Sequence, residues 1–417
     1  MREGSENRRK PMSMRITALC ASAAAGLLCA TWSGAPYRAW ERGPSASESF
    51  FPIGVWLQNP ARAAVYRRGG FNLYIGLWKG PTEAQLEALR KAGMRTVCAQ
   101  NEVGLRHRSD PTIAGWMHGD EPDNAQPLPG GKGYGPPIPP EKVVADYRRM
   151  RRADPSRPVL LNLGQGVAWD GWYGRGPRSR HPEDYPKYIQ GCDIVSFDIY
   201  PAAHRSPEVA GKLWRVARGV ERLRRWSQGK KIVWNCIECT RISNPDARPT
   251  PRQVRAEVWM SLIHGSQGLI YFVHEWVPRF TESGLLENLS MWRAVTNINW
   301  RIRRLAPALN SPTLPDAAEI ETVPAGGKVA WMTKQWRGRL YVFAVEMEGR
   351  PVQAAFRFPK GPKEGRITVL GENREVRLAG GRFSDRFAPW DVHLYSVPCG
   401  GSGEENPFEQ NVRENER

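Results

Sequence analysis

The sequence predicts an α/β protein in which a (β/α)8 barrel is followed by a small antiparallel β-sandwich. Between residues 50 and 310, eight short apolar runs alternate with longer amphipathic stretches, the pattern of parallel strands joined by helices. From about residue 311 the runs are short and alternate apolar with polar residues, and glycine-containing turns separate several of them. The length of 417 residues accommodates both units.

The barrel strands are predicted first, because their number decides between a closed barrel and an open sheet. They are Phe51–Gln58, Phe71–Trp78, Met94–Gln100, Ile113–Asp120, Pro158–Gly164, Cys192–Tyr200, Lys231–Glu238 and Gly268–Glu275. An open doubly wound sheet would usually have fewer strands and a glycine-rich phosphate loop, and the sequence contains no G-x-G-x-x-G or Walker motif. Eight strands therefore favour the barrel.

Helices are predicted in the connections between these strands. They are Thr82–Gly93, Glu141–Ala153, Ser206–Gly229, Pro251–Gly265 and Leu289–Leu309. Thr82 is a typical N-cap and Gly93 a typical C-terminal residue, and apolar residues recur at helical spacing after residue 206. Two long connections, Asp123–Pro140 and Gln165–Pro186, follow strands four and five, and we interpret them as walls of a site.

The C-terminal unit is predicted as a sandwich of short strands. The runs are Val329–Gln335, Leu340–Glu346, Val352–Phe358, Ile367–Leu370, Glu375–Leu378 and Val392–Val397. We expect a signal peptide at 1–35, a linker at 36–49, the barrel at 50–310, the sandwich at 311–399 and a disordered tail at 400–417.

The first 35 residues have the composition of an export signal. Arg8, Arg9, Lys10 and Arg15 form a basic start, and the stretch from Ile16 to Trp32 is apolar but too short and alanine-rich for a membrane span. We therefore expect a secreted, periplasmic or cell-surface protein without stable membrane insertion.

Charge and aromatic content constrain the partners. The chain carries a formal charge of +18, or about +15 without residues 1–35. No nucleic-acid-binding motif accompanies this charge and the arginines are spread over several helices, so we expect a solvated basic surface or, alternatively, an anionic glycan partner. The 17 tryptophans fit both a large core and the stacking of sugar rings.

Five cysteines follow the signal, an odd number that argues against a full disulfide framework. Cys236 and Cys239 have C-x-x-C spacing, which can indicate redox or metal chemistry. On a strand, positions three apart face opposite sides, so we interpret both as core residues.

Carboxylates follow four predicted strands, at the end of the barrel where such proteins place their sites. Strand four ends in Asp120 and Glu121, strand six contains Asp198, strand seven ends in Glu238 and strand eight in Glu275. Hydrolysis of a glycosidic bond requires a proton donor and a second carboxylate. The sequence thus offers candidates for both roles.

The strand-four motif Gly-Asp-Glu-Pro and the glutamate that ends strand seven resemble clan A of the glycoside hydrolases, the 4/7 superfamily. The resemblance covers about residues 50–310, and an appended β-sandwich is also common among such enzymes. It implies that Glu121 is the acid/base and Glu238 the nucleophile. The family usually has an asparagine before the acid/base, where this chain has Asp120, which would alter a hydrogen bond to the sugar 2-hydroxyl.

Two aromatic residues also match the family. Tyr200 corresponds to the strand-six aromatic whose hydroxyl orients the nucleophile, and Trp276 to the strand-eight aromatic at the floor of the sugar site. The resemblance thus implies a secreted retaining glycoside hydrolase that cleaves β-glycosidic bonds by double displacement, with carboxyls about 5–5.5 Å apart. Glu275 is the rival of Glu238 as nucleophile, and Asp198 is more often a positioning residue than a catalytic one.

Further residues at the strand ends are candidates for sugar contacts. They are Gln58, Trp78, His118, Asp120, Asn162, Asp198, His274 and Glu275. A metal site at His118, Asp120 and His274 is the weaker interpretation, because strand one lacks the His-x-His of barrel metallohydrolases. We expect no metal or cofactor and a poly- or oligosaccharide substrate. A non-catalytic carbohydrate-binding barrel and a metal-dependent sugar deacetylase remain alternatives, and the oligomeric state stays open.

Overall fold

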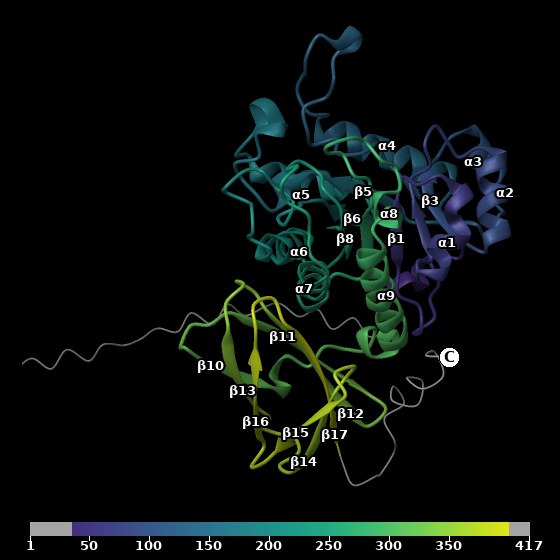
Figure 1. The fold of residues 1–417 in the computed structure, drawn as a ribbon. Helices are drawn as coiled ribbons and strands as arrows, with labels where there is room; N and C mark the ends of the chain where they lie inside the picture. The colour runs from purple at the N-terminus through teal and green to yellow at the C-terminus, as the bar shows by residue number, and fades with distance from the viewer. Residues whose placement is uncertain (1–35, 400–417) are drawn as a thin grey trace, which may run out of the picture.

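The computed structural model describes residues 36–399. The predicted signal peptide and C-terminal tail lie outside the described residues. In Figure 1 the barrel and its helices form one unit, and the β-strands after residue 318 form a second unit beneath it.

A closed parallel barrel forms the first unit. Its strands are β1 (Ile53–Trp56), β2 (Leu73–Ile75), β3 (Arg95–Ala99), β4 (Ile113–Met117), β5 (Val159–Leu163), β6 (Ile194–Phe197), β7 (Ile232–Val233), β8 (Asn235–Glu238) and β9 (Leu269–Phe272). Consecutive strands pair in parallel, and β9 pairs with both β8 and β1. Only Trp234 separates β7 from β8, so together they are the seventh barrel strand and β9 is the eighth. All eight predicted strands are confirmed.

Helices surround the barrel. They are α1 (Ala63–Arg68), α2 (Glu83–Ala92), α3 (Glu102–Arg106), α4 (Pro140–Ala153), α5 (Tyr185–Tyr188), α6 (Trp214–Trp226), α7 (Pro251–Ile263), α8 (Gly284–Glu287) and α9 (Leu289–Leu309). Thr82 and Gln85 form a capping box at the start of α2, and Gly93 ends that helix with a φ of 61°. No helix within 36–399 has both the length and the apolar character to cross a bilayer.

One predicted helix is shorter than expected. We predicted Ser206–Gly229, but turns occupy residues 206–213 and α6 begins at Trp214. Gly211 has a φ of +72°, and its amide donates to the carbonyl of Pro201. A left-handed residue stops helical hydrogen bonding, so the apolar spacing before it reflects packing of a turn.

Alternate residues along β6 belong to two different cores, one outside and one inside the barrel, as predicted. Val195, Phe197 and Ile199 pack in the layer between the barrel and its helices, whereas Ile194 and Tyr200 belong to the cluster inside the barrel. Cys236 likewise lies inside and Cys239 outside, which confirms the expected opposite faces. Together with Cys98, Cys192 and Cys399 they are free thiols.

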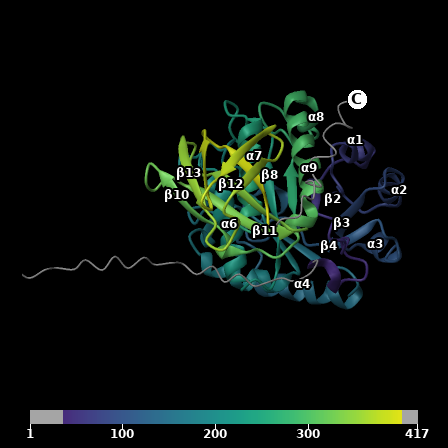
Figure 2. The same cartoon turned by 90° about the horizontal axis from the view of Figure 1, so that it is seen from below.

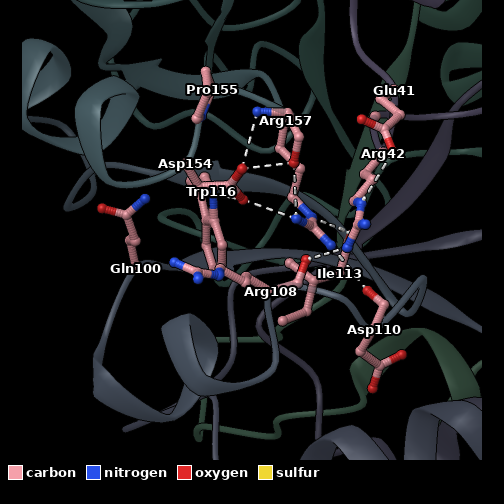
Figure 3. Close-up of polar contacts among 12 residues, drawn as sticks. Glu41, Arg42, Gln100, Arg108, Asp110, Ile113, Trp116, Asp154, Pro155 and Arg157 are labelled. Atoms are coloured by element: carbon pink, nitrogen blue, oxygen red, sulfur yellow. Dashed lines mark hydrogen bonds and ion pairs between the residues drawn. The ribbon is translucent and has the colours of Figure 1, made fainter.

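A buried ion pair closes the amino-terminal end of the barrel (Figure 3). Arg157 is fully buried, and its Nη1 donates to Asp154 Oδ2 at 2.8 Å, while its Nε donates to the carbonyl of Ile113 at 2.8 Å. Trp116 Nε1 donates to the same Asp154 oxygen at 3.0 Å. Every guanidinium and carboxylate atom of Arg157 and Asp154 has a partner within the chain, which indicates that this ion pair serves stability.

The second unit is a two-sheet sandwich. One sheet contains β10 (Glu319–Val323), β13 (Val352–Arg357) and β16 (Arg382–Phe387), and the other contains β11 (Val329–Trp336), β12 (Arg339–Glu346), β14 (Gly365–Val369), β15 (Arg374–Leu378) and β17 (Val392–Pro398). The predicted antiparallel pairing is confirmed. We missed β10 and β16, whose exposed positions include Glu319, Glu321, Arg382 and Arg386. The second sheet packs against α7 and α9 (Figure 2).

Candidate functional site

Three carboxyls meet at the mouth of the barrel, beyond the carboxyl ends of its strands. Asp120 and Glu121 follow β4, and Asp198 follows β6. Asp120 is exposed to solvent, while Glu121 and Asp198 are half-buried. Glu121 has a φ of +43°, a conformation that residues other than glycine rarely adopt. Such backbone strain occurs most often at functional sites.

The strained backbone of Glu121 is held from both sides. Its amide donates to the carbonyl of Asn162 on β5 at 3.2 Å, and its carbonyl accepts from the amide of Asn124 at 3.0 Å. Gly164 is required beside it, because a Cβ there would lie 2.9 Å from Glu121 Oε1 and 2.8 Å from the side chain of Asn124. The glycine thus lets the β5 end approach the carboxyl closely.

Neutral side chains orient the cluster. Asn124 Nδ2 donates to Glu121 Oε2 at 2.8 Å, and Asn162 Nδ2 donates to Asp120 Oδ1 at 2.9 Å. Trp172, in the connection after β5, donates through Nε1 to Asn124 Oδ1 at 2.8 Å. The predicted long connections therefore meet beside Glu121, and we missed Asn124 and Trp172 because neither belongs to a strand.

The three carboxyls have unequal affinities for protons. Enclosure by the barrel raises the pKa of Asp198 to about 6, with interactions to Glu121 and Tyr200 opposing the rise. Burial and the charge of Asp198 raise the pKa of Asp120 to about 7. The same two causes raise the pKa of Glu121 well above its usual range. Near neutral pH the arrangement therefore favours an ionised Asp198 beside a protonated Glu121.

A row of aromatic rings leads away from the cluster. Tyr200 lies 5.1 Å from Phe272, Phe272 lies 5.2 Å from His274, and His274 lies 6.3 Å from Trp276, all between ring centroids. Phe280 packs 4.9 Å from Trp276. Trp276 and Phe280 are 50% and 55% exposed, so the outer end of the row has apolar faces open to solvent. We predicted Tyr200, His274 and Trp276 here, and missed Phe272 and Phe280.

Glu238 ends the seventh strand, as predicted, but lies in different surroundings. It is fully buried, and its two oxygens accept from the amides of Ala202 at 2.5 Å and Ala203 at 2.7 Å. The neighbouring carboxyl is that of Glu257 on α7, behind the barrel wall. Burial raises the pKa of Glu238 to about 7, against the lowering effect of the two amides and Glu257.

Neither carboxyl of the sequence-predicted pair is among the main influences on the pKa of the other. The carboxyls around Glu121 are Asp120, Asp123 and Asp198, whereas Glu257 is the one beside Glu238. Burial, followed by the charge of Glu238, raises the pKa of Glu257 well above its usual range. The role of Glu238 as nucleophile stays a prediction.

Other predicted residues divide between the mouth and the framework. Glu275 lies at the mouth and accepts from Arg248 Nη2 at 2.7 and 2.8 Å. Trp78 is 70% exposed after β2. Gln58 is buried and serves the framework, donating to the carbonyl of Glu282 at 2.6 Å and accepting from the Tyr66 hydroxyl at 2.6 Å.

The two predicted histidines also separate. His118 shares the outer face of β4 with Trp116, and its Nε2 lies 2.8 Å from the carbonyl of Gly191. This placement, toward α4, does not support the expected sugar contact of His118. His274 stays at the mouth, with Nε2 3.3 Å from the carbonyl of Leu57. Within residues 36–399, no three His, Cys, Asp or Glu side chains form a group suited to a metal ion.

A cavity of about 380 Å³ lies elsewhere, between the barrel and the sandwich. Its lining includes Arg224, His264 and Lys334, and none of the mouth carboxyls. It is therefore separate from the candidate site.

No protein-family model matches the chain, and no curated protein does. Solved structures do match. AmyP in complex with maltose superposes with a TM-score of 0.51 at 10% identity, over 85% of this chain and 98% of that one. The alpha-amylase of Geobacillus thermoleovorans complexed with acarbose gives a TM-score of 0.50 at 10% identity, over 86% of this chain and 100% of that one. At such low identity the likeness establishes the fold, a barrel followed by a β-sandwich, as the sequence predicted.

Proposed function

We propose that this chain is a glycoside hydrolase acting on a poly- or oligosaccharide, with Glu121 as its proton donor and Asp198 as the carboxylate that stays ionised. The observation that carries the proposal is the carboxyl cluster at the barrel mouth, where neighbouring groups differ in pKa. When two neighbouring carboxyls differ in pKa, the one with the higher pKa can act as the acid. At the same pH the other is ionised and can act as a base or stabilise positive charge.

Proton donation explains the strained position of Glu121. Asn124 and the β5 end fix its carboxyl, and the adjacent charge of Asp198 keeps it protonated. As the glycosidic bond breaks, Glu121 transfers its proton to the leaving oxygen, and positive charge develops on the sugar ring. An ionised Asp198 would stabilise that charge most strongly in the transition state. This stabilisation would lower the activation free energy of hydrolysis.

The aromatic row supports a saccharide as ligand. Sugar rings have apolar faces that stack on exposed aromatic rings, and Trp276 and Phe280 offer such faces beyond the carboxyls. The two solved structures described above hold maltose and acarbose. Export, inferred from the composition of residues 1–35, would bring the site to a glycan outside the cytoplasm.

Retention at a β-glycosidic bond, with Glu238 as nucleophile, is the finer assignment that the family resemblance implies. Glu238 would reach a sugar only after its bonds to the amides of Ala202 and Ala203 open. Asp198 interacts directly with Glu121, so we place it first. Substitutions of each residue separate the two assignments.

The test is the release of reducing ends from a panel of neutral and acidic glycans by the wild type and by Glu121→Gln. We expect turnover of at least one glycan, and a loss of about 10²–10⁴-fold in the variant, which has no proton to donate. Substrates with phenolate leaving groups, which need little protonation, should suffer far less. A folded wild type that turns over no glycan, or a Glu121→Gln variant with full activity, would overturn the proposal.

A further inference from the structure

Two arginines flank the outer end of the aromatic row. Arg241 and Arg248 both belong to the connection between β8 and α7, and both approach Glu275. The main chain fixes their place, because the amide of Trp276 donates to the carbonyl of Arg241 at 2.9 Å. Thr240 Oγ1 donates to the carbonyl of His274 at 2.6 Å, which ties the two connections together again.

Glu275 does not use the full hydrogen-bonding capacity of these arginines. Arg248 Nη2 donates to both of its oxygens, whereas Arg241 Nη1 remains 3.9 Å from the nearer one. Arg248 Nε has no partner among residues 36–399, and no hydrogen bond from the Arg241 guanidinium is found there. The two side chains are 32% and 33% exposed, although Arg248 Nε itself is buried.

We propose that Arg241 and Arg248 form a subsite for an acidic sugar, one that carries a carboxylate or a sulfate ester, stacked on Trp276. This inference rests on the proposed function, because it names the substrate class of the same site. A guanidinium binds an oxyanion through paired N–H groups, and two guanidiniums beside one carboxylate leave a net positive charge for the ligand to neutralise. The exposed ring of Trp276 supplies the apolar face on which the sugar lies.

The distance from the reacting carboxyls favours this location. An acidic sugar next to Asp198 would be repelled by its charge, which would weaken binding. Phe272 and His274 separate Trp276 from Tyr200, so the arginines hold the acidic group away from Asp198. The bond to be cleaved would then lie at the Tyr200 end of the row, beside Glu121 and Asp198.

The experiment measures binding and turnover separately. The probes are oligosaccharides from pectate, alginate and glucuronan, each compared with the same material after chemical reduction of its carboxyls to hydroxymethyl groups, and sulfated galactans compared with their desulfated forms. Calorimetry with the Glu121→Gln variant measures affinity without hydrolysis. We expect at least one acidic probe to bind tenfold or more tightly than its neutral counterpart, with the difference shrinking as salt rises.

Arg241→Gln and Arg248→Gln should each remove most of that preference while leaving affinity for the neutral counterpart unchanged. Arg248→Lys should restore part of it, and Arg366→Gln, which removes an 82% exposed arginine from the sandwich, should leave it intact. A preference for the neutral form, no binding of any probe, or a preference that survives both glutamine variants would overturn the subsite. Charge-dependent binding without wild-type turnover would instead contradict the proposed hydrolysis and leave the subsite standing.

Discussion

Two groups of carboxyls with raised pKa values lie about the same barrel, and their surroundings differ. Asp120, Glu121 and Asp198 lie at the mouth, where solvent reaches them. Glu238 ends the seventh strand and Glu257 lies on α7, and both are fully buried. Burial is the first cause of the raised pKa in both groups, so the shift alone does not mark a catalytic site. Access and hydrogen-bond partners distinguish them.

The partners indicate a different task for each group. Glu238 accepts two amide hydrogens from Ala202 and Ala203, which follow Tyr200 and Pro201, and so fixes the connection that positions this tyrosine at the mouth. Glu121 and Asp120 are held by side-chain amides instead, and each leaves a face toward solvent. We therefore assign support of the site to the inner pair and chemistry to the outer cluster.

After that of Glu121→Gln, the largest expected effect is that of Asp198→Asn. Removing the charge beside Glu121 takes away stabilisation of the developing positive charge, so kcat should fall about 10²–10³-fold. Glu238→Gln, the matched change in the buried pair, should lower activity much less, because its amide oxygen can still accept one backbone hydrogen. Initial rates on the best glycan of the panel measure both.

Azide separates the two carboxylates more sharply. A small anion can replace a missing nucleophile, so azide would restore turnover in Glu238→Ala and give a product of inverted configuration if Glu238 is the nucleophile. We expect no such rescue at Glu238. Rescue there, together with nearly full activity of Asp198→Asn, would show that the sequence-implied assignment is right and ours wrong.

The pH profile is the second way to test the comparison. Turnover requires an ionised Asp198, so kcat/KM should rise as pH increases through about 6. It should fall again at higher pH, once Glu121 loses its proton, because the pKa of Glu121 is raised well above its usual range. Asp198→Asn should lose the acidic limb, whereas Glu257→Gln should keep both limbs. An acidic limb unchanged in Asp198→Asn would contradict the assignment.

The buried pair predicts a change in stability. Glu238 and Glu257 have higher pKa values in the folded chain than in the unfolded chain. Their contribution to stability is therefore complete below about pH 4.5 and is lost as pH rises through about 7. In the Glu257→Gln variant the side-chain amide is neutral without binding a proton, and its N–H can donate a hydrogen bond to Glu238. Its free energy of unfolding should therefore exceed that of the wild type by about 1–3 kcal/mol at pH 8 and match it near pH 5.

Denaturant unfolding at the two pH values measures this difference. Glu346→Gln is the matched control, because Glu346 is also buried and accepts from the amides of Glu348, Gly349 and Trp390. That variant should be less stable than the wild type at both pH values. A Glu257→Gln variant that is destabilised equally at pH 5 and pH 8 would show that ionisation of this pair does not reduce the stability of the wild type.

Sequence periodicity was sufficient to predict the barrel, because each strand is an apolar run and the connections carry helical signals. The strand that ends in Glu238 was also predicted correctly. Alternation along β8 places this side chain on the face of Cys236, but it does not reveal that the amides of Ala202 and Ala203 occupy both carboxylate oxygens. Those amides come from another strand's connection, and no pattern along one segment reveals such a contact.

The missed site residues share the same cause. Asn124 and Trp172 lie in connections without strand or helix periodicity, and they act through hydrogen bonds between segments far apart in sequence. His118 illustrates the converse, since it lies within the predicted strand, one residue beyond the observed end of β4, but follows Met117, which points inward, and so faces α4. The inward–outward alternation of side chains along β4 could have revealed the orientation of His118 from the sequence.

The smallest expected effect is that of Trp276→Ala, which tests whether the aromatic row belongs to the outer cluster. Losing one exposed stacking face should weaken binding by about 0.5–1.5 kcal/mol, or roughly 2–12-fold in KM, with kcat nearly unchanged. Trp300→Ala, which removes a 41% exposed tryptophan from α9, should leave both constants unchanged. Trp78 is more exposed than Trp276, and no ring contact joins it to the row among the described residues. If Trp78→Ala raises KM more than Trp276→Ala does, the saccharide lies over β2 and the row from Tyr200 to Trp276 is packing, because a ring that binds the sugar must lose affinity when its face is removed.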